Sequence, residues 1–279
     1  MHGPFADWDA VAAGTLTGHA LRTRYRPVYP SIYLRRDIEL TAALRAEAAW
    51  RWSKQRAVIA GNSAAALHRA KWVDARSPAE VIHGNRRPPV GIRVWSDDVD
   101  DDEIVDVGGM RVCTPARTAF DLARRYPLDR AVAAIDALAN ATRLDMLDVE
   151  KLIAAHPGRR GIPTARKALK LVDGGSESPR ETWLRLLVGR AGYPRPDTQI
   201  RVRDRHHYEF ARIDLGWEDK QIGLEYEGKH HQTDRFTYER DIRRLDDLSR
   251  LGWTSIRVTA ADTEDSVLIR LGQVWSRRV

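Results

Sequence analysis

The stretch Asp214-Leu-Gly-Trp-Glu-Asp-Lys-Gln-Ile-Gly-Leu-Glu225-Tyr-Glu227-Gly-Lys-His-His231 decides the fold of the C-terminal part of this chain. Its first acid ends a strand-like run, and Glu225 and Glu227 stand one residue apart on a second run. Because strand side chains alternate between the two faces of a sheet, these two carboxylates point to one face. The core then lies on the other face, toward Ile222, Leu224 and Tyr226.

Asp214 lies on the neighbouring strand and is expected to close a carboxylate cluster with Glu225. Converging carboxylates suit a hard, oxygen-loving cation, so the sequence predicts Mg²⁺ or Mn²⁺ as the cofactor. Such a cation activates water and offsets charge in the cleavage of a phosphodiester bond. A zinc site is not expected, because the histidine pairs of the chain lack the spacing of zinc ligands.

The same motif resembles the PD-(D/E)XK nuclease superfamily, in the branch related to very-short-patch-repair endonucleases. In that branch a strand ending in Asp precedes a strand reading E-x-(D/E)-G-x-x-H, which here is residues 225–231. The helix motif D-x-x-R-x-x-x-L-x-x-x-G of the branch is matched by Asp241, Arg244, Leu248 and Gly252. The resemblance covers about residues 176–279, and it implies a restriction-endonuclease-like mixed sheet flanked by helices.

The resemblance also implies roles for residues around the two main acids. The backbone carbonyl of Tyr226 would join Asp214 and Glu225 at the cation. Glu227 stands where the superfamily often has Lys, so the general base is left open. Glu227 would position water or hold a second cation, and Lys229 would supply the missing positive charge from the loop. His231 matches the trailing His, which would protonate the leaving oxygen or hold the scissile phosphate. The pair His206-His207 has no counterpart in the family.

Glu181 has two interpretations. Ser178-Pro-Arg-Glu181 reads as a capping box at the start of a helix, which is a purely structural role. The family resemblance instead makes Glu181 the helix carboxylate that approaches the metal, with Glu177 as the fallback.

Nucleic-acid contacts are expected from the helix predicted over residues 234–251 and from the strand before Asp214. Arg244 matches the basic position of the family and would contact backbone phosphate, as would Arg240. A salt bridge from Arg244 to Asp241 or Asp247 is the structural alternative. Gln199 precedes the first strand, as in relatives where it contacts the edge of the active site.

Composition bounds the class of protein. The chain has 279 residues, enough for two domains, and no apolar run of the length needed to span a membrane. Its one cysteine, Cys113, excludes an internal disulfide, and no signal peptide is recognised, so a cytoplasmic protein is expected. The net charge is +7, and the segment Arg22 to Arg93 holds 15 basic and 5 acidic residues. That segment is either a phosphate-backbone footprint or a solvated, arginine-rich surface.

The N-terminal half resembles the antitoxin of type IV abortive-infection toxin–antitoxin systems. The motifs that carry the resemblance are Ser31–Leu34, Ser63-Ala-Ala-Ala-Leu-His68 and Thr114-Pro-Ala-Arg117-Thr-Ala-Phe-Asp121-Leu-Ala. It implies a DNA-binding winged helix followed by a mixed α/β domain, and a toxin partner. About 30 residues precede Ile32, too few for three helices and a hairpin, so we expect a truncated winged helix.

We therefore predict an α/β protein with two domains. Residues 1–175 form an antitoxin-like α+β domain that binds nucleic acid, and residues 176–279 form a nuclease-like domain, with Asp173-Gly-Gly-Ser-Glu-Ser between them. Within the first domain, Arg117 and Asp121 are expected to form a structural ion pair. The acidic run 97–103 is expected to be an exposed loop.

Two functions follow from this organisation. The first is a metal-dependent DNA endonuclease or nickase, in which all the motif acids are present. The second is a non-enzymatic DNA-binding regulator or type IV antitoxin whose nuclease fold is retained as a scaffold. Neither requires a membrane.

Overall fold

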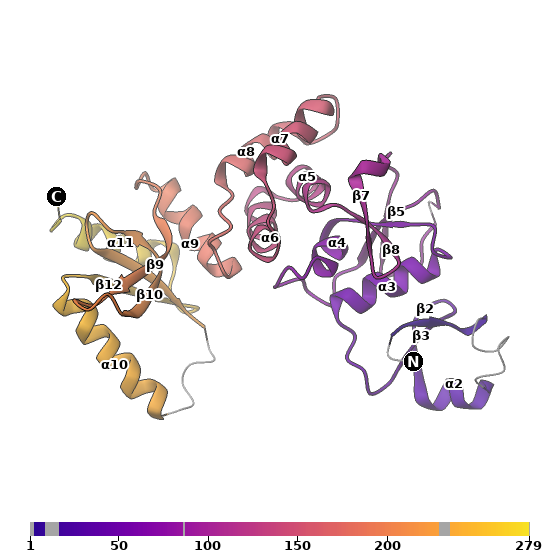
Figure 1. Cartoon of the computed structure of the whole chain (residues 1–279), viewed down its shortest axis with the longest axis horizontal. Coiled ribbons are helices and arrows are strands. Elements are labelled where there is room, and N and C mark those ends of the chain that lie inside the picture. The colour runs from indigo at the N-terminus through magenta and orange to yellow at the C-terminus, as the bar shows by residue number, and fades with distance from the viewer. Residues whose placement is uncertain (1–2, 9–16, 86, 229–234, 279) are drawn as a thin grey trace. The chain divides into compact units, whose positions relative to one another are not determined.

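The computed structural model describes residues 3–8, 17–85, 87–228 and 235–278. The chain divides into two compact units, residues 1–172 and 173–279 (Figure 1). The described residues contain ten α-helices and three sheets, which confirms the predicted α/β class. In these residues no helix combines the length and the apolar character that crossing a membrane requires.

The first unit begins with a three-stranded antiparallel sheet of order β1-β3-β2. Its elements are β1 (Phe5–Ala6), α2 (Gly18–Arg24), β2 (Tyr25–Tyr29) and β3 (Ile32–Arg35). A tight turn joins β2 to β3, with Ser31 in the left-handed region at a φ of 62°. Tyr29, Ile32 and Leu34 are buried, so the inward-facing residues of the hairpin join the core.

A five-stranded mixed sheet follows, with the order β6-β5-β4-β8-β7. Its strands are β4 (Val58–Ile59), β5 (Ala79–Ile82), β6 (Ile92–Trp95), β7 (Ile104–Val107) and β8 (Met110–Cys113). Helices α3 (Ala42–Trp52) and α4 (Gly61–Leu67) pack against it through small side chains, since Ala46, Ala49 and Ala64 are fully buried.

Four helices complete the first unit: α5 (Pro115–Arg125), α6 (Leu128–Ala141), α7 (Met146–Ala155) and α8 (Ile162–Leu171). The first of them contacts the other three, so α5 is the centre of this helical layer. Its start is the one the sequence predicts, because the Thr114 side chain accepts a hydrogen bond from the backbone N–H of Arg117 at 3.2 Å and Pro115 opens the helix.

The acidic run 97–103 links β6 to β7 as the loop that the sequence predicts, and its acids Asp98, Asp100, Asp101 and Asp102 are exposed. Its two end residues differ from that prediction. The side chains of Asp97 and Glu103 are 10% and 6% exposed, and they pair with Arg124 and Arg117 of α5. The run includes a short 3-10 helix, η1 (Asp101–Glu103). The buried arginines of α5 explain the difference, because a cation inside a protein requires an opposite charge beside it.

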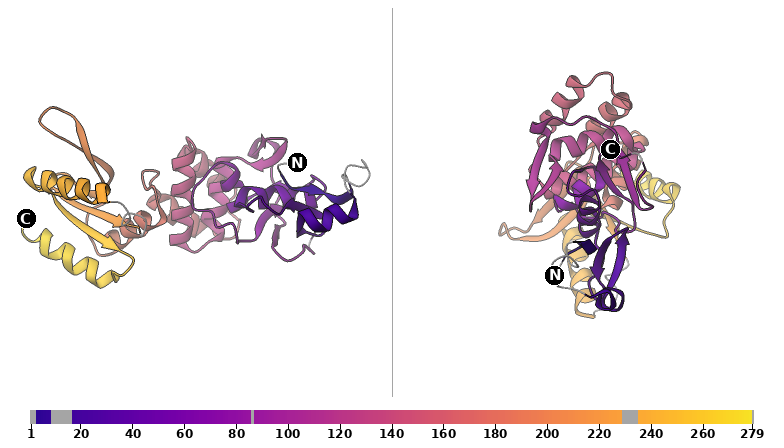
Figure 2. Two further views of the ribbon diagram at one scale, coloured as in Figure 1. Left: turned by 90° about the horizontal axis from the view of Figure 1, so that it is seen from below. Right: turned by 90° about the vertical axis from the view of Figure 1, so that its right-hand side faces the viewer.

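The second unit has one four-stranded sheet of order β12-β11-β10-β9 between helices (Figure 2). Its elements are α9 (Pro179–Arg190), β9 (Asp197–Arg203), β10 (Glu209–Trp217), β11 (Ile222–Glu227), α10 (Arg235–Arg250), β12 (Thr254–Thr259) and α11 (Glu264–Trp275). Strands β9, β10 and β11 are antiparallel, and β12 runs parallel to β11. The parallel pair requires a crossover, which α10 provides.

Two predicted strand boundaries in this unit are wrong. Strand β10 continues past Asp214 to Trp217, because Leu215 and Trp217 are buried and pair with Leu224 and Ile222 of β11. Gln199 lies within β9 rather than before it. In β10 the apolar alternation continues past the acid, whereas β9 extends to Thr198 and Asp197 because these residues pair with Leu215 and Gly216 of β10.

Candidate nucleic-acid interface and carboxylate cluster

Helix α2 is exposed apart from the half-buried Ala20 and Leu21. None of its seven residues is buried, and its last turn carries Arg22 and Arg24. The Thr17 side chain caps the helix by accepting a hydrogen bond from the backbone N–H of Ala20 at 3.2 Å. Neither arginine has a side-chain hydrogen bond or ion pair within the described residues, so both guanidinium groups are free to meet an external anion.

The β2–β3 hairpin follows α2 directly. Two of its arginines are engaged within the protein, since Arg26 donates to the backbone carbonyl of Ile38 at 2.7 Å and Arg35 forms a two-pronged contact with Asp37 at 2.6 Å. Arg36 donates to the carbonyl of Arg22 at 3.3 Å, which ties the end of the hairpin to the end of α2. The helix and the hairpin therefore form one basic element.

This element corresponds to part of the predicted winged helix. A helix leads into a hairpin, and β1 adds a third strand beside β3. Residues 9–16 lie outside the description. An exposed helix that carries cations beside a hairpin is an arrangement that can contact the phosphates of DNA.

The second candidate site lies where β10 and β11 separate. Leu215 pairs with Leu224, so the next residues outward, Asp214 and Glu225, stand opposite each other and share a face of the sheet. The strands do not continue their ladder at this point. Instead, the backbone N–H of Tyr226 donates to Asp214 Oδ2 at 2.9 Å. Glu225 lies near enough for its charge to raise the pKa of Asp214, and the cation site predicted from the two carboxylates stays a prediction.

Asp214 has a strongly shifted acidity. Burial raises the pKa of its carboxyl to about 7, and the negative charges of Glu181 and Glu225 add to the rise. The hydrogen bond from Tyr226 and the charge of Arg244 act in the opposite direction. The carboxylates of Glu181 on α9 and Glu225 on β11 thus both act on the Asp214 carboxyl of β10.

Glu181 takes part in the helix cap that the sequence predicts at Ser178, but its carboxylate accepts from the Ser178 hydroxyl and the backbone N–H of Glu177 rather than from the backbone N–H of Ser178. Its backbone N–H donates to Ser178 Oγ at 3.2 Å, and its carboxylate accepts from the Ser178 hydroxyl at 2.7 Å and from the backbone N–H of Glu177 at 2.8 Å. It also accepts from Gln199 Nε2 at 2.9 Å. Burial raises the pKa of Glu181, and these hydrogen bonds oppose the rise. Its structural role and its proximity to Asp214 therefore coexist.

Glu225 already has a cationic partner. Arg244 Nη1 lies 2.7 Å from its carboxylate, and the Ser255 hydroxyl donates to it at 2.5 Å. Arg244 and Leu248 are one turn apart on α10, and Leu248 is buried against residues of β9 and β10. The same face of the helix therefore directs both side chains toward the sheet. The phosphate contact predicted for Arg244 competes with this ion pair.

Glu227 lies on the same strand but has a different partner. Its carboxylate pairs with Arg257 of β12 at 2.7 Å, and 34% of its side chain is exposed. Lys229 and His231 fall outside the described residues, as does the side chain of Arg240. The catalytic and phosphate-binding roles predicted for these three residues remain predictions.

The donor set suits a hard cation in its chemistry, but it is not a preformed metal site. Over the described ranges, no group of three or more His, Cys, Asp and Glu side chains is arranged to hold a metal ion. Arg244 neutralises Glu225 in the position a cation would take. Binding of Mg²⁺ to Glu225 would therefore require the ion pair between Arg244 and Glu225 to break.

Sequence reasoning missed the partners that come from distant segments. Arg257 and Ser255 belong to β12, and they contact acids of β11 because the two strands are parallel neighbours. Alternation along β12 indicates that Ser255 and Arg257 share a face. The pairing of β12 with β11 is needed before that face can be assigned to the acids.

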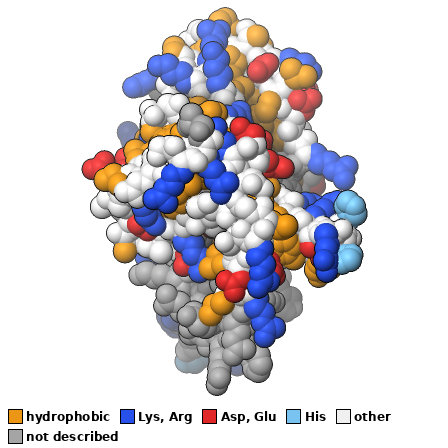
Figure 3. All heavy atoms as spheres, turned by 90° about the vertical axis from the view of Figure 1, so that its left-hand side faces the viewer, with side chains coloured by type: hydrophobic (Ala, Val, Ile, Leu, Met, Phe, Trp, Pro, Cys, Tyr) orange, Lys and Arg blue, Asp and Glu red, His pale blue; other side chains and the backbone are white. Residues whose placement is uncertain are grey.

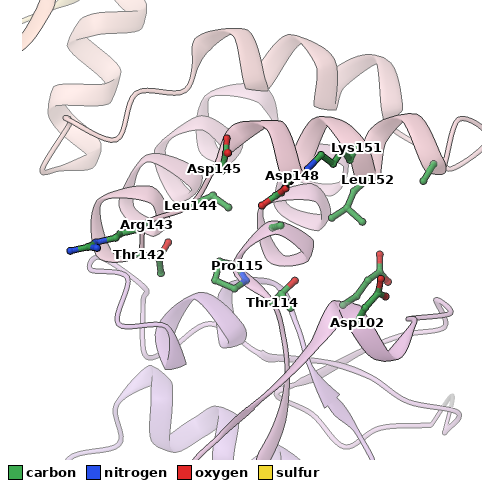
Figure 4. Close-up of a pocket in the computed structure, with 13 residues that line it drawn as sticks. Asp102, Thr114, Pro115, Thr142, Arg143, Leu144, Asp145, Asp148, Lys151 and Leu152 are labelled. Carbon is green, nitrogen blue, oxygen red and sulfur yellow. Dashed lines mark hydrogen bonds and ion pairs between the residues drawn. The ribbon is translucent and has the colours of Figure 1, made fainter.

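A separate pocket of about 530 Å³ lies in the first unit, between the start of α5, η1 and α7 (Figure 4). Its charged side chains have structural partners. Lys151 contacts Asp148 at 2.8 Å, and Asp145 caps α7 by accepting from the backbone N–H of Leu147 at 2.9 Å. None of the predicted site residues lines this pocket.

Comparison with known proteins supports the antitoxin-like part of the prediction. Residues 56–171 match the family described as the AbiEi antitoxin C-terminal domain. The matched segment contains the five-stranded sheet and helices α4 to α8. It includes no residue of the second unit, so the nuclease interpretation of that unit depends on its sequence motif and its geometry.

Two curated relatives are uncharacterized proteins of Mycobacterium tuberculosis, from strains CDC 1551 and H37Rv. Each is 34% identical over 156 residues, which is 56% of this chain and 57% of the relative. The chain thus spans little more than half the length of the curated relatives it matches. No solved structure matches the chain.

Proposed function

We propose that the chain is a DNA-binding regulator of the antitoxin type, which contacts DNA through α2 and the β2–β3 hairpin. The observation that carries the proposal is α2 itself, a helix without buried residues whose two arginines are exposed, in the unit whose residues 56–171 match an antitoxin family. An autoregulatory antitoxin would bind the region upstream of its own coding sequence. The same family match is the reason to look for a toxin partner.

Replacing both Arg22 and Arg24 by glutamine should weaken binding to a duplex from the upstream region on the order of tenfold at physiological salt. Each lost phosphate contact also lowers the slope of log affinity against log salt by about 0.9. Gel shift over a salt series measures both quantities. The matched control is Arg166→Gln/Lys167→Gln, which removes the same charge from exposed positions of α8. An equal loss of affinity in the two variants would mean that α2 contributes only general positive charge and is not a specific DNA contact.

A second candidate function is a Mg²⁺- or Mn²⁺-dependent DNA endonuclease. The observation that favours it is that Glu181 and Glu225 lie near enough to Asp214 for their charges to raise its pKa. These carboxylates and the Tyr226 carbonyl would hold the cation. The bound cation would supply Lewis acidity and activate water. The residues of the chain would position that water, with Glu227 near the same strand end.

Plasmid incubated with Mg²⁺ or Mn²⁺ tests this second function. Nicking by the wild type that falls to background in Asp214→Ala and in Glu225→Ala, and that a chelator abolishes, is the expected result. The exposed Asp219→Ala, in the turn between β10 and β11, should cleave like the wild type. No nicking by the wild type with either cation would remove the hydrolytic function.

A further inference from the structure

The outer part of strands β9 and β10, residues 201–212, forms a two-stranded ribbon that we call the hairpin arm. The two strands pair along their length, from Arg203 with Glu209 to Asp197 with Gly216. Within the described residues, β11 pairs with β10 only between Leu215 and Trp217. The arm therefore projects past the third strand of the sheet, as both views of Figure 2 show.

The hairpin arm carries cations on one face. Arg201 and Arg203 alternate with the buried Val202, and Arg212 is the cross-strand partner of Arg201. Figure 3 shows histidine and basic side chains gathered on a lobe that projects from this side of the second unit. Acids of the protein engage two of the cations, since Arg212 pairs with Glu177 at 3.1 Å and Arg201 lies 3.7 Å from Glu209. Among the described residues, no ion pair joins Arg203 or Arg205 to an acid, although the charge of Arg205 lowers the pKa of the neighbouring Asp204. Arg205 Nε donates a hydrogen bond to His206 Nε2 at 3.2 Å.

The tip of the arm is held in one shape by Asp204. One carboxylate oxygen of this residue accepts hydrogen bonds from the backbone N–H groups of His206, at 2.8 Å, and Tyr208, at 3.0 Å. His207 adopts the left-handed backbone region at a φ of 62°. The negative charge is thereby committed to the turn, and the tip exposes two imidazoles and a tyrosine ring that is 70% exposed.

We propose that the hairpin arm is a second DNA contact, which enters the major groove of duplex DNA. The major groove admits a two-stranded ribbon, whereas the deep, narrow major groove of duplex RNA does not admit side chains in this way. Arg203 and Arg205 would lie against backbone phosphates on either side of the groove. At the tip, the imidazoles of His206 and His207 and the hydroxyl of Tyr208 would donate hydrogen bonds to base edges, and the Tyr208 ring would contact the bases. The inference builds on DNA as the ligand in the proposed function, but it places this contact on the second unit, apart from α2.

Binding of the full-length chain to a labelled duplex of about 30 base pairs from the upstream region, followed by fluorescence anisotropy over a salt series, tests the proposal. Arg203→Gln/Arg205→Gln should weaken binding on the order of tenfold and lower the salt slope by about 2. Arg166→Gln/Lys167→Gln, with the same loss of charge, should stay near the wild type. Both arginines of the arm are exposed, and a circular-dichroism melt equal to that of the wild type verifies the fold.

The α2 variant Arg22→Gln/Arg24→Gln separates the two proposals. Weakening by the arm variant but not by the α2 variant supports the arm and overturns the proposed role of α2. Weakening by the α2 variant alone overturns the arm and leaves the proposed function intact. Competition by duplex RNA as effective as that by DNA overturns the groove assignment, and no binding of any duplex by the wild type overturns both.

Discussion

Replacing Arg117 by alanine should destabilise the first unit by about 3–5 kcal/mol. Arg117 is 2% exposed, its Nε lies 2.9 Å from Asp121, and its Nη1 contacts Glu103. Both carboxylates are nearly as buried as the arginine. Alanine leaves the buried carboxylate of Glu103 without its arginine, while Asp121 keeps Arg124 at 2.6 Å. An uncompensated charge in a low-dielectric interior costs far more than the pair contributes when intact.

The matched control for this substitution is Arg111→Ala. Arg111 lies 3.8 Å from Asp101 in a pair whose side chains are 51% and 103% exposed, so its removal should change the free energy of unfolding by less than about 0.5 kcal/mol. Hydrogen exchange followed by mass spectrometry reports each unit separately. Faster exchange is expected in α5 and its neighbours in Arg117→Ala, with the second unit unchanged. A cost similar to that of the control would mean that the buried carboxylates are neutral without Arg117.

The second large effect is expected from Asp214→Asn. The pKa of Asp214 is raised to about 7 in the folded chain, while an unfolded aspartate titrates near its ordinary value of 3.8. Between about pH 4 and pH 7 the folded state therefore holds a proton that the unfolded state has lost. Stability falls as pH rises through this window and levels off above it. Asparagine does not titrate, and its amide oxygen can still accept the hydrogen bond from Tyr226.

We expect Asp214→Asn to match the wild type near pH 4 and to exceed it near pH 8 by on the order of 2–4 kcal/mol. The lower end of that range is favoured, since the Asp214 side chain retains partial contact with solvent. Denaturant unfolding at several pH values, in the presence of a chelator, measures the difference. Asp219→Asn, an exposed carboxylate in the turn before β11, should show no such growth with pH. A constant difference between wild type and Asp214→Asn would mean that Asp214 is ionised throughout.

Features set by residues two to four positions apart could be predicted from the sequence. The alternation in residues 222–226 placed Ile222 and Leu224 in the core, and both are fully buried. The caps at Thr114 and Ser178 were recognisable from residue type and spacing, because a capping hydrogen bond spans only three residues. The Arg117–Asp121 ion pair was predictable for the same reason, since residues four apart meet on one face of a helix.

Partner choice between distant segments was not predictable in this way. The sequence predicts that Asp97 and Glu103 lie in a solvated loop, whereas α5 places two buried arginines beside them. From the sequence, Arg244 could contact a DNA phosphate or pair with a neighbouring acid. In the structure it pairs with Glu225, because Leu248 on the same face of α10 packs against the sheet. The projection of the hairpin arm likewise depends on where β11 stops pairing with β10.

By itself, the sequence determined which residues share a strand face or a helix turn, and it placed the acids of β10 and β11 in register for a cluster. The tertiary structure decided which charge neutralises each of those acids, and which strands extend beyond the sheet. The physical reason is one of range. Backbone geometry fixes relations over two to four residues, whereas the partner of a buried charge is fixed by packing between elements that lie far apart in the chain.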